Sequence, residues 1–175
     1  MNVSGRAVLA APRDLVFDAI CDPRALLEVI PGCEEIEQVA PGEYHGRIAI
    51  RLPALVGTYR TVVRLVETDR PAHGSFDGRV DGRAGSIAGR ASFSLADAGG
   101  RTVVDFEGHG VVGGPLARLD SRFLEGFAES LIREGLQRLD GRLQVARTAP
   151  EAEAATEAGA EASTVAAATP ADPGR

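Results

Sequence analysis

The side chains that most often carry chemistry are few in this sequence and scattered along it. The two cysteines, Cys21 and Cys33, are too few for a disulfide framework, and no histidine stands at metal-ligand spacing from either. No Ser/His/Asp or Cys/His set forms a recognisable local catalytic motif. We therefore interpret the cysteines as small buried thiols, and we expect neither a catalytic nor a metal site.

A cluster of histidine and acidic residues and two glycine pairs have the residue types of a functional site, but they lack the surrounding sequence that such sites need. His109 alternates with Asp105 and Glu107, so the three side chains point to one side of an expected strand, as a solvated cluster does. The pairs Gly99-Gly100 and Gly113-Gly114 lack the strand–GxGxxG–helix arrangement that binds phosphate. We interpret both pairs as turns.

At the start of the chain, proline, aspartate and glycine mark the boundaries of the elements that position these residues. Residues 3–10 alternate weakly and predict a strand. Pro12 then opens a short helix, and a second begins with Asp22 as N-cap and Pro23 in its first turn. Pro31-Gly32 ends this second helix.

The middle of the chain alternates between strand-like runs and short turns, and a helical stripe of leucine and phenylalanine follows from Leu116 to Leu143. Because sequential strands usually pair with their neighbours, we predict an α+β fold with an antiparallel sheet. In it a curved seven-stranded antiparallel sheet wraps a long C-terminal helix, with two short helices after the first strand. The six further strands are expected at residues 33–39, 43–52, 59–67, 74–82, 86–96 and 102–112.

The composition changes near Thr148. Beyond it five acidic residues face one arginine, so this segment carries −4 of the net charge of −6, and Val165 is its only large aliphatic residue. Such a segment buries too little apolar surface to offset the entropy of ordering. We predict a folded domain over residues 1–147 and a disordered acidic tail over 148–175, with room for transient helix at 152–168.

Charge and hydropathy exclude several classes of protein. A net charge of −6 argues against nucleic-acid binding, which needs a concentrated positive face. No run approaches the ~20 apolar residues of a membrane span. The first residues lack the basic stretch and apolar block of a signal peptide, so we expect a cytoplasmic protein.

Small residues recur on the expected inner face of the sheet. Glycines there could serve the bends of a curved sheet, or their missing side chains could leave a hollow against the helix. Curvature itself lifts a sheet from its helix, so the two interpretations support each other, and we expect an apolar cavity. The small inward residues are Gly78, Gly82, Gly89, Ala91, Gly108 and Gly110.

Thirteen residues are candidate contacts for a ligand in this cavity. Those on the helices could equally be plain core, since an aromatic stripe at four-residue spacing is common there. Tyr59 is the inward polar group that could donate to a ligand carbonyl, because a buried hydroxyl needs a partner. The candidates are Phe17, Ile20, Leu27, Ile30, Tyr59, Phe76, Gly89, Phe93, Phe106, Gly108, Phe123, Phe127 and Leu131.

The order of elements resembles the helix-grip fold of the START/Bet v1-like (SRPBCC) superfamily of hydrophobic-ligand binders. Local sequence narrows the resemblance to the carbon monoxide dehydrogenase G-subunit family over residues 1–145. The matching pieces are Ala11-Pro12 with Val16-Phe17, Asp22-Pro23, Leu26, Ile30-Pro31-Gly32-Cys33-Glu34, Gly57-Thr58-Tyr59, Gly89-Arg90-Ala91 and Val111-Val112-Gly113-Gly114-Pro115-Leu116-Ala117.

This resemblance implies a non-catalytic accessory protein for a molybdenum-containing carbon monoxide dehydrogenase or a related hydroxylase. Its ligand would be a quinone such as menaquinone, with no tightly bound cofactor, and the redox chemistry would be the quinone's own. The resemblance also leaves room for transient contact with the inner face of the cell membrane. Anionic lipid should repel the acidic tail, so a loop by the cavity mouth is the better candidate for such contact.

Two other functions stay open on the sequence. Polyketide cyclases and aromatases share the fold, but such an enzyme would be expected to place acid and base residues in the cavity, and few acidic side chains, such as Glu67 at a strand end, are expected to face inward. A generic lipid-transfer protein without a dehydrogenase partner would have the same apolar cavity, and the sequence does not separate it from a quinone carrier.

Overall fold

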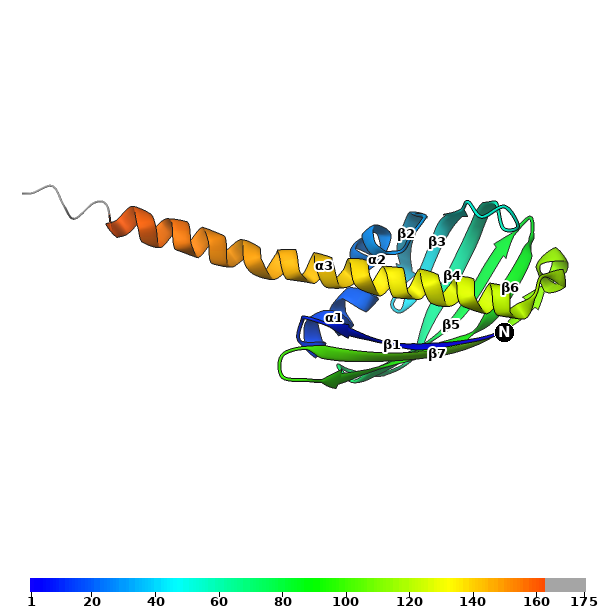
Figure 1. The fold of residues 1–175 in the computed structure, drawn as a ribbon, viewed down its shortest axis with the longest axis horizontal. Coiled ribbons are helices and arrows are strands. Elements are labelled where there is room, and N and C mark those ends of the chain that lie inside the picture. Colours follow the sequence, from blue (N-terminus) through cyan, green and yellow to red (C-terminus); the bar gives the residue numbers. More distant parts are fainter. Residues whose placement is uncertain (163–175) are drawn as a thin grey trace, which may run out of the picture. The chain divides into compact units, whose positions relative to one another are not determined.

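The computed structural model describes residues 1–162 of the chain (Figure 1). Seven strands, three α-helices and a short 3-10 helix follow the predicted order. They are β1 (Asn2–Leu9), α1 (Arg13–Cys21), α2 (Pro23–Val29), β2 (Cys33–Ala40), β3 (Glu43–Ile50), β4 (Gly57–Asp69), β5 (His73–Gly82), β6 (Gly85–Asp97), β7 (Thr102–Gly113), the 3-10 helix (Gly114–Arg118) and α3 (Ser121–Ala162).

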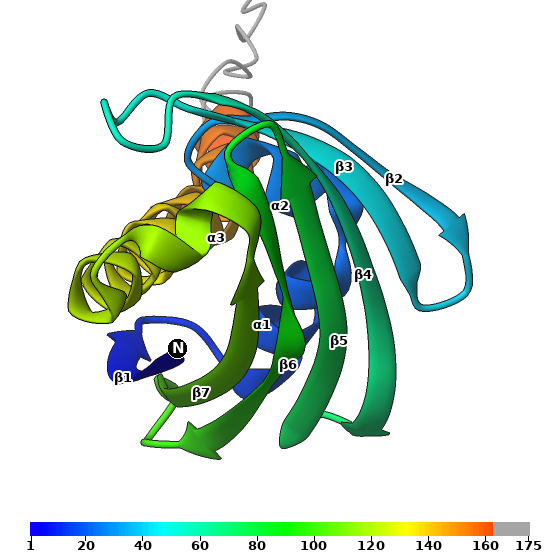
Figure 2. The same ribbon diagram turned by 90° about the vertical axis from the view of Figure 1, so that its right-hand side faces the viewer.

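All seven strands belong to one antiparallel sheet of order β1-β7-β6-β5-β4-β3-β2. Strands β2 to β7 follow one another as neighbours, and β1 returns to pair with β7. The sheet curves around the first part of α3, and α1 and α2 lie at one end of it (Figures 1 and 2). The predicted α+β, helix-grip architecture is confirmed.

The start of α2 follows the expected local chemistry. The Asp22 carboxylate accepts a hydrogen bond from the backbone N–H of Arg24 at 3.0 Å, and Pro23 occupies the first helical position. An N-cap oxygen satisfies a backbone donor that has no partner within the helix, and proline loses nothing where no such bond exists. Asp22 and Pro23 therefore fix where α2 begins.

The start of α3 differs from the prediction. The leucine spacing predicts a helix from Leu116, but Leu116 lies in the 3-10 helix, Leu119 is extended, and α3 begins at Ser121. Asp120 sets this point, because its Oδ1 accepts from the backbone N–H of Phe123 at 3.1 Å. That contact is an N-cap bond, and Asp120 is its signal in the sequence.

The chain divides into two compact units, Met1–Leu143 and Gln144–Arg175. The first contains the whole sheet and α3 as far as Leu143. In the second, α3 continues to Ala162, so residues 148–162 of the expected tail are helical, and residues 163–175 lie outside the described residues. The disorder expected of the tail stays a prediction. Among residues 1–162, no helix is long and apolar enough to cross a membrane.

The buried core of the first unit falls into two clusters. The larger joins α1 and α2 to β6, β7 and α3, with Val16, Leu95 and Leu139 among its members. The smaller gathers Leu55, Tyr59, Leu116 and Leu124. A sheet packed evenly on its helix would have one continuous core, so the division marks a region between sheet and helix that side chains do not fill.

Two buried polar contacts tie the β1–α1 connection to distant elements. The Thr102 hydroxyl, which is fully buried, donates to the carbonyl of Ala11 at 2.6 Å. The backbone N–H of Ala10 donates to Asp140 Oδ1 on α3 at 2.7 Å. Together they hold α1 against the start of β7 and against α3.

The outer strands of the sheet are β1 and β2. On β1, the N–H groups of Asn2 and Ser4 donate to carboxylates of α3, Glu125 at 2.7 Å and Glu129 at 3.3 Å. Strand β2 contains glutamate at positions 34, 35 and 37 and two register irregularities against β3.

Candidate ligand-binding cavity

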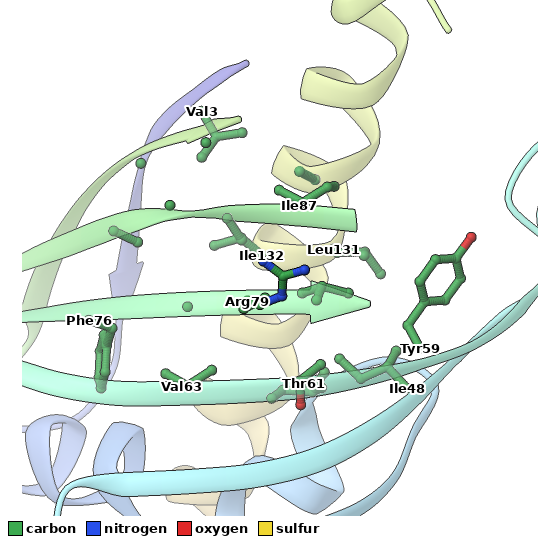
Figure 3. A pocket seen from close by; sticks show the side chains of 18 of the residues that line it. Val3, Ile48, Tyr59, Thr61, Val63, Phe76, Arg79, Ile87, Leu131 and Ile132 are labelled. Carbon is green, nitrogen blue, oxygen red and sulfur yellow. The ribbon is translucent and has the colours of Figure 1, made fainter. Parts of the chain in front are cut away.

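A cavity of about 580 Å³ lies between the inner face of the sheet and the helices (Figure 3). Its wall is almost wholly apolar and draws on every strand, on α1, α2 and α3, and on the loop before β4. The larger apolar side chains of the wall are Met1, Val3, Ile20, Leu26, Ile30, Ile36, Ile48, Ile50, Leu55, Val63, Phe76, Val80, Ile87, Leu116, Leu124, Phe127, Leu131 and Ile132.

The strand register aligns small residues into a row across the sheet. Gly78 on β5 pairs with Gly89 on β6, which pairs with Gly110 on β7, and all three line the cavity. No side chain rises from this row toward α3. The hollow that the sequence predicts therefore has its floor at these three glycines.

The glycines of the row serve different purposes. A Cβ on Gly78 would have only Val63 Cγ2 and the Val62 carbonyl near it, at 3.9 and 4.0 Å, so the missing side chain leaves usable space. A Cβ on Gly89 would stand 2.0 Å from the carbonyl oxygen of His109, so a side chain there clashes with the neighbouring strand. Gly78 fits the interpretation as space, whereas Gly89 serves the close approach of two backbones.

Eight of the thirteen candidate residues line the cavity, and five do not. This placement locates the side chains and does not test their role in binding. The eight are Ile20, Ile30, Tyr59, Phe76, Gly89, Gly108, Phe127 and Leu131.

Three of the other five are core aromatics. Phe17 and Phe93 are buried against each other, with ring centroids 5.7 Å apart, and Phe106 packs on the same cluster. Phe93 lies over Gly74 and Phe106 over Gly5, each a glycine on the neighbouring strand. These two rings fill the space above a glycine, so they cover the sheet instead of facing the ligand space.

The last two, Leu27 and Phe123, are 42% and 43% exposed. Leu26 and Ile30 line the cavity from α2, so Leu27 falls beside that face. On α3 the wall residues begin at Leu124, with Phe127 and Leu131 following at helical spacing. Leu124 holds the inward position of that turn, so Phe123, one residue earlier and about 100° around the helix, lies off the inner face.

Sequence reasoning missed some wall residues for identifiable reasons. Ile48, Val63 and Ile87 stand at alternating positions that predict an inner face, but alternation does not separate residues that face a cavity from those that pack on a helix. Leu55 and Leu116 come from a loop and from the 3-10 helix, where alternation gives no signal.

The tyrosines of the wall have their hydroxyls engaged. Tyr59 donates to the carbonyl of Leu55 at 2.9 Å, and Tyr44 donates to the carbonyl of Cys21 at 2.8 Å. Burial raises the pKa of both phenols, so both are neutral donors. In this arrangement the single proton of Tyr59 is donated to Leu55, so donation from Tyr59 to a ligand stays a prediction that would require this hydrogen bond to break.

The charged residues that border the cavity have their charged ends in exposed ion pairs. Arg79 pairs with Asp81 at 2.6 Å and Arg90 with Asp77 at 2.7 Å, and both arginine side chains are more than half exposed. Glu35 pairs with Arg47 at 3.1 Å, and the exposed His109 contacts Asn2 Oδ1 at 2.8 Å. Among residues 1–148, no group of three His, Cys, Asp or Glu side chains is placed to hold a metal ion.

A second hollow of about 490 Å³, the outer hollow, adjoins the cavity. The two share Cys33, Ile50, Phe127 and Leu131. The outer hollow is less apolar than the cavity, and Glu34 and Arg51 border it. The Cys33 thiol donates to the carbonyl of Glu35 at 3.5 Å, and burial raises its pKa, so it is a neutral thiol.

Solved structures share this architecture. A conserved protein from Geobacillus kaustophilus superposes with a TM-score of 0.78 at 22% identity, covering 82% of this chain and 95% of that one. A START superfamily protein from Mycobacterium smegmatis superposes with a TM-score of 0.66 at 13% identity, covering 82% and 97%. These similarities establish the fold. No curated protein matches the chain.

The sequence itself matches one family model, described as CoxG, the G subunit of carbon monoxide dehydrogenase, over residues 5–144. This match spans the sheet from Gly5 of β1 onward, both short helices and α3 through the residues that face the cavity. The chain belongs to the CoxG family, the G subunits of carbon monoxide dehydrogenase.

Proposed function

We propose that this protein binds a neutral isoprenoid quinone such as menaquinone. It would carry the quinone as electron acceptor for a molybdenum-containing carbon monoxide dehydrogenase or a related hydroxylase. Family and fold are those of an accessory protein that binds a hydrophobic ligand. The quinone and the dehydrogenase are the specific parts of the proposal.

The observation that carries the proposal is an apolar cavity with no ionic end facing it among the described residues. Its volume of about 580 Å³ lies within the ~300–1,000 Å³ typical of small-molecule sites. Burying a carboxylate or a phosphate there would leave an unpaired charge in an apolar space, at a large cost. A neutral ring system with an isoprenoid tail avoids this cost.

The residues of the wall fit binding better than catalysis. Its two phenols are committed to backbone carbonyls, and its carboxylates and guanidinium groups are paired in solvent. A general acid or base must reach the reacting group, and none of these is placed to do so. The protein would supply shape and exclusion of water, and the quinone would supply the redox chemistry.

The outer hollow is the proposed access route for the ligand, because it shares wall residues with the cavity. The loop that begins with Arg51 lies beside it and contains Val56, which is 65% exposed. An apolar side chain with a neighbouring arginine suits contact with an anionic lipid surface. We place the proposed membrane contact at this loop.

Titration with a short-chain menaquinone tests the proposal. The chain has two tyrosines and no tryptophan, and both tyrosines line the cavity, so their emission reports directly on its occupation. We expect saturable quenching at 1:1 stoichiometry. Absence of saturation below roughly 50 µM quinone, beside clear binding of a fatty acid or phospholipid, would instead support a lipid-transfer protein.

A further inference from the structure

One polar side chain in the cavity wall lacks a partner. Thr61 lies on the inner face of β4 and lines the cavity, and its hydroxyl makes no hydrogen bond among the described residues. Every other polar side chain of the wall is engaged. These are Cys33, Glu35, Tyr44, Tyr59, Arg79, Arg90 and His109.

The strand register keeps this hydroxyl uncovered. Thr61 pairs with Gly46 on β3 and with Val80 on β5. A Cβ on Gly46 would stand 3.0 Å from Thr61 Oγ1, so the hydroxyl points toward the place where Gly46 has no side chain. No buried side-chain oxygen or nitrogen among the described residues is sealed off without a partner, so Oγ1 is open to the cavity.

The position of Thr61 is also specific within the cavity. The adjacent cross-strand row contains Cys33, Ile48 and Tyr59, where the outer hollow begins. The row on the other side contains Gly78 and leads to the open floor of the cavity. Figure 3 shows Thr61 between Val63 and Ile48. The hydroxyl thus stands between the outer hollow and the glycine floor of the cavity.

A ligand that fills the cavity buries this hydroxyl, and a buried donor without an acceptor is unfavourable. Binding is therefore most favourable when a ligand oxygen accepts a hydrogen bond from it. A single neutral donor with no cation beside it suits a carbonyl oxygen better than a carboxylate, which attracts charged donors. We propose that Thr61 donates a hydrogen bond to one carbonyl of the bound ligand and holds its carbonyl-bearing end near the outer hollow. This inference rests on the proposed quinone function and adds its specificity-determining residue.

The variant Thr61→Val tests the inference, because valine keeps the shape and suits a strand. Calorimetry would compare wild type, Thr61→Val and Thr61→Ser with a short-chain menaquinone and with squalene, an isoprenoid hydrocarbon without oxygen. We expect Thr61→Val to weaken quinone binding roughly 2- to 12-fold, the loss of one neutral hydrogen bond, and to leave squalene binding unchanged. Thr61→Ser, which retains the hydroxyl, should bind the quinone more tightly than Thr61→Val.

The infrared carbonyl stretch of the bound quinone gives a second readout that a purely structural role would not move. One carbonyl band should lie at lower frequency in wild type and return to the frequency of the free carbonyl in Thr61→Val. Equal quinone affinity and equal spectra in wild type and Thr61→Val would overturn the role of Thr61 while leaving quinone binding intact. Failure of the wild-type protein to bind the quinone at all would overturn both proposals.

Discussion

Gly78 and Gly89 are paired on neighbouring strands of the cavity floor, yet a side chain at each would meet different surroundings. Leucine at Gly78 would extend into free space. Leucine at Gly89 would collide with the backbone of β7 and separate paired strands. A leucine at Gly78 therefore tests whether the ligand occupies the floor of the cavity, whereas a leucine at Gly89 tests the pairing of the strands.

We predict that Gly78→Leu folds and binds menaquinone at least ~10-fold more weakly, because its side chain occupies ligand space. Gly126→Leu is the matched control, since Gly126 is exposed on α3 with nothing within 4 Å of a Cβ. Calorimetric titration and thermal melts would be run on both. Undiminished affinity in a folded Gly78→Leu would show that the ligand does not use the floor of the cavity.

Phe127 and Phe123 form a second matched pair, one turn apart on α3. Phe127 lines the cavity, whereas Phe123 is 43% exposed. We expect Phe127→Ala to reduce the free energy of quinone binding by about 1–2 kcal/mol, through lost apolar contact, and Phe123→Ala to leave it unchanged. Tyrosine quenching would measure both. Equal losses in the two variants would point to an effect on α3 as a whole.

Single side chains are also where the sequence is least informative. Alternation finds the inner faces, because a strand side chain must point to one side or the other. It cannot show that Tyr59 bonds to Leu55, nor that Thr61 lies opposite Gly46, because both depend on the register between strands and on a loop. The same limit explains why the pattern assigns Phe93 and Phe106 to the cavity.

Among the elements, α3 matters most, because it supplies one whole wall of the cavity and its start fixes which residues face inward. Asp120→Ala removes the oxygen that accepts from Phe123 N–H. We expect this variant to lose about 1 kcal/mol of stability, a fall in melting temperature of roughly 3–5 °C. Asp120→Asn, which keeps a capping oxygen, should melt close to wild type in the same calorimetric scan. Identical melting of all three proteins would mean that the cap contributes nothing.

The order of the elements could be predicted almost completely, because proline, glycine and aspartate caps punctuate the chain at each boundary. The pairing of β1 with β7 was not predicted, since no local signal in the sequence joins residues so far apart. The leucine spacing predicts the start of α3 too early, because it includes Leu116 of the 3-10 helix and the extended residue Leu119.

For the molecule as a whole, we predict that quinone affinity is constant between about pH 5 and 8. Burial raises the pKa of Cys33, Tyr44 and Tyr59, so these wall groups stay protonated and neutral throughout this range. A carboxylate ligand would behave differently and bind more weakly as pH rises, because its charged form loses hydration in the cavity. Titrations at several pH values distinguish the two, and a steep pH dependence would contradict a neutral ligand.

The acidic segment, residues 148–175, should contribute little to the thermal stability of the protein. A chain ending at Arg147 should keep its melting temperature within about 3 °C, because residues 148–175 offer almost no apolar surface for packing. Differential scanning calorimetry of the full chain and the shortened chain would check this. A fall of more than ~5 °C would show that the segment packs on the domain.

The contacts on the outer strands have a consequence for association between copies. An open sheet has two free edges, and each is a template for a further strand. On β1, backbone N–H groups of the free edge already donate to Glu125 and Glu129 of α3. On β2, three glutamates and an irregular register disfavour the addition of a further strand. Both edges are therefore covered by glutamate carboxylates, and a second copy would have to displace them before its strand could extend the sheet at either end.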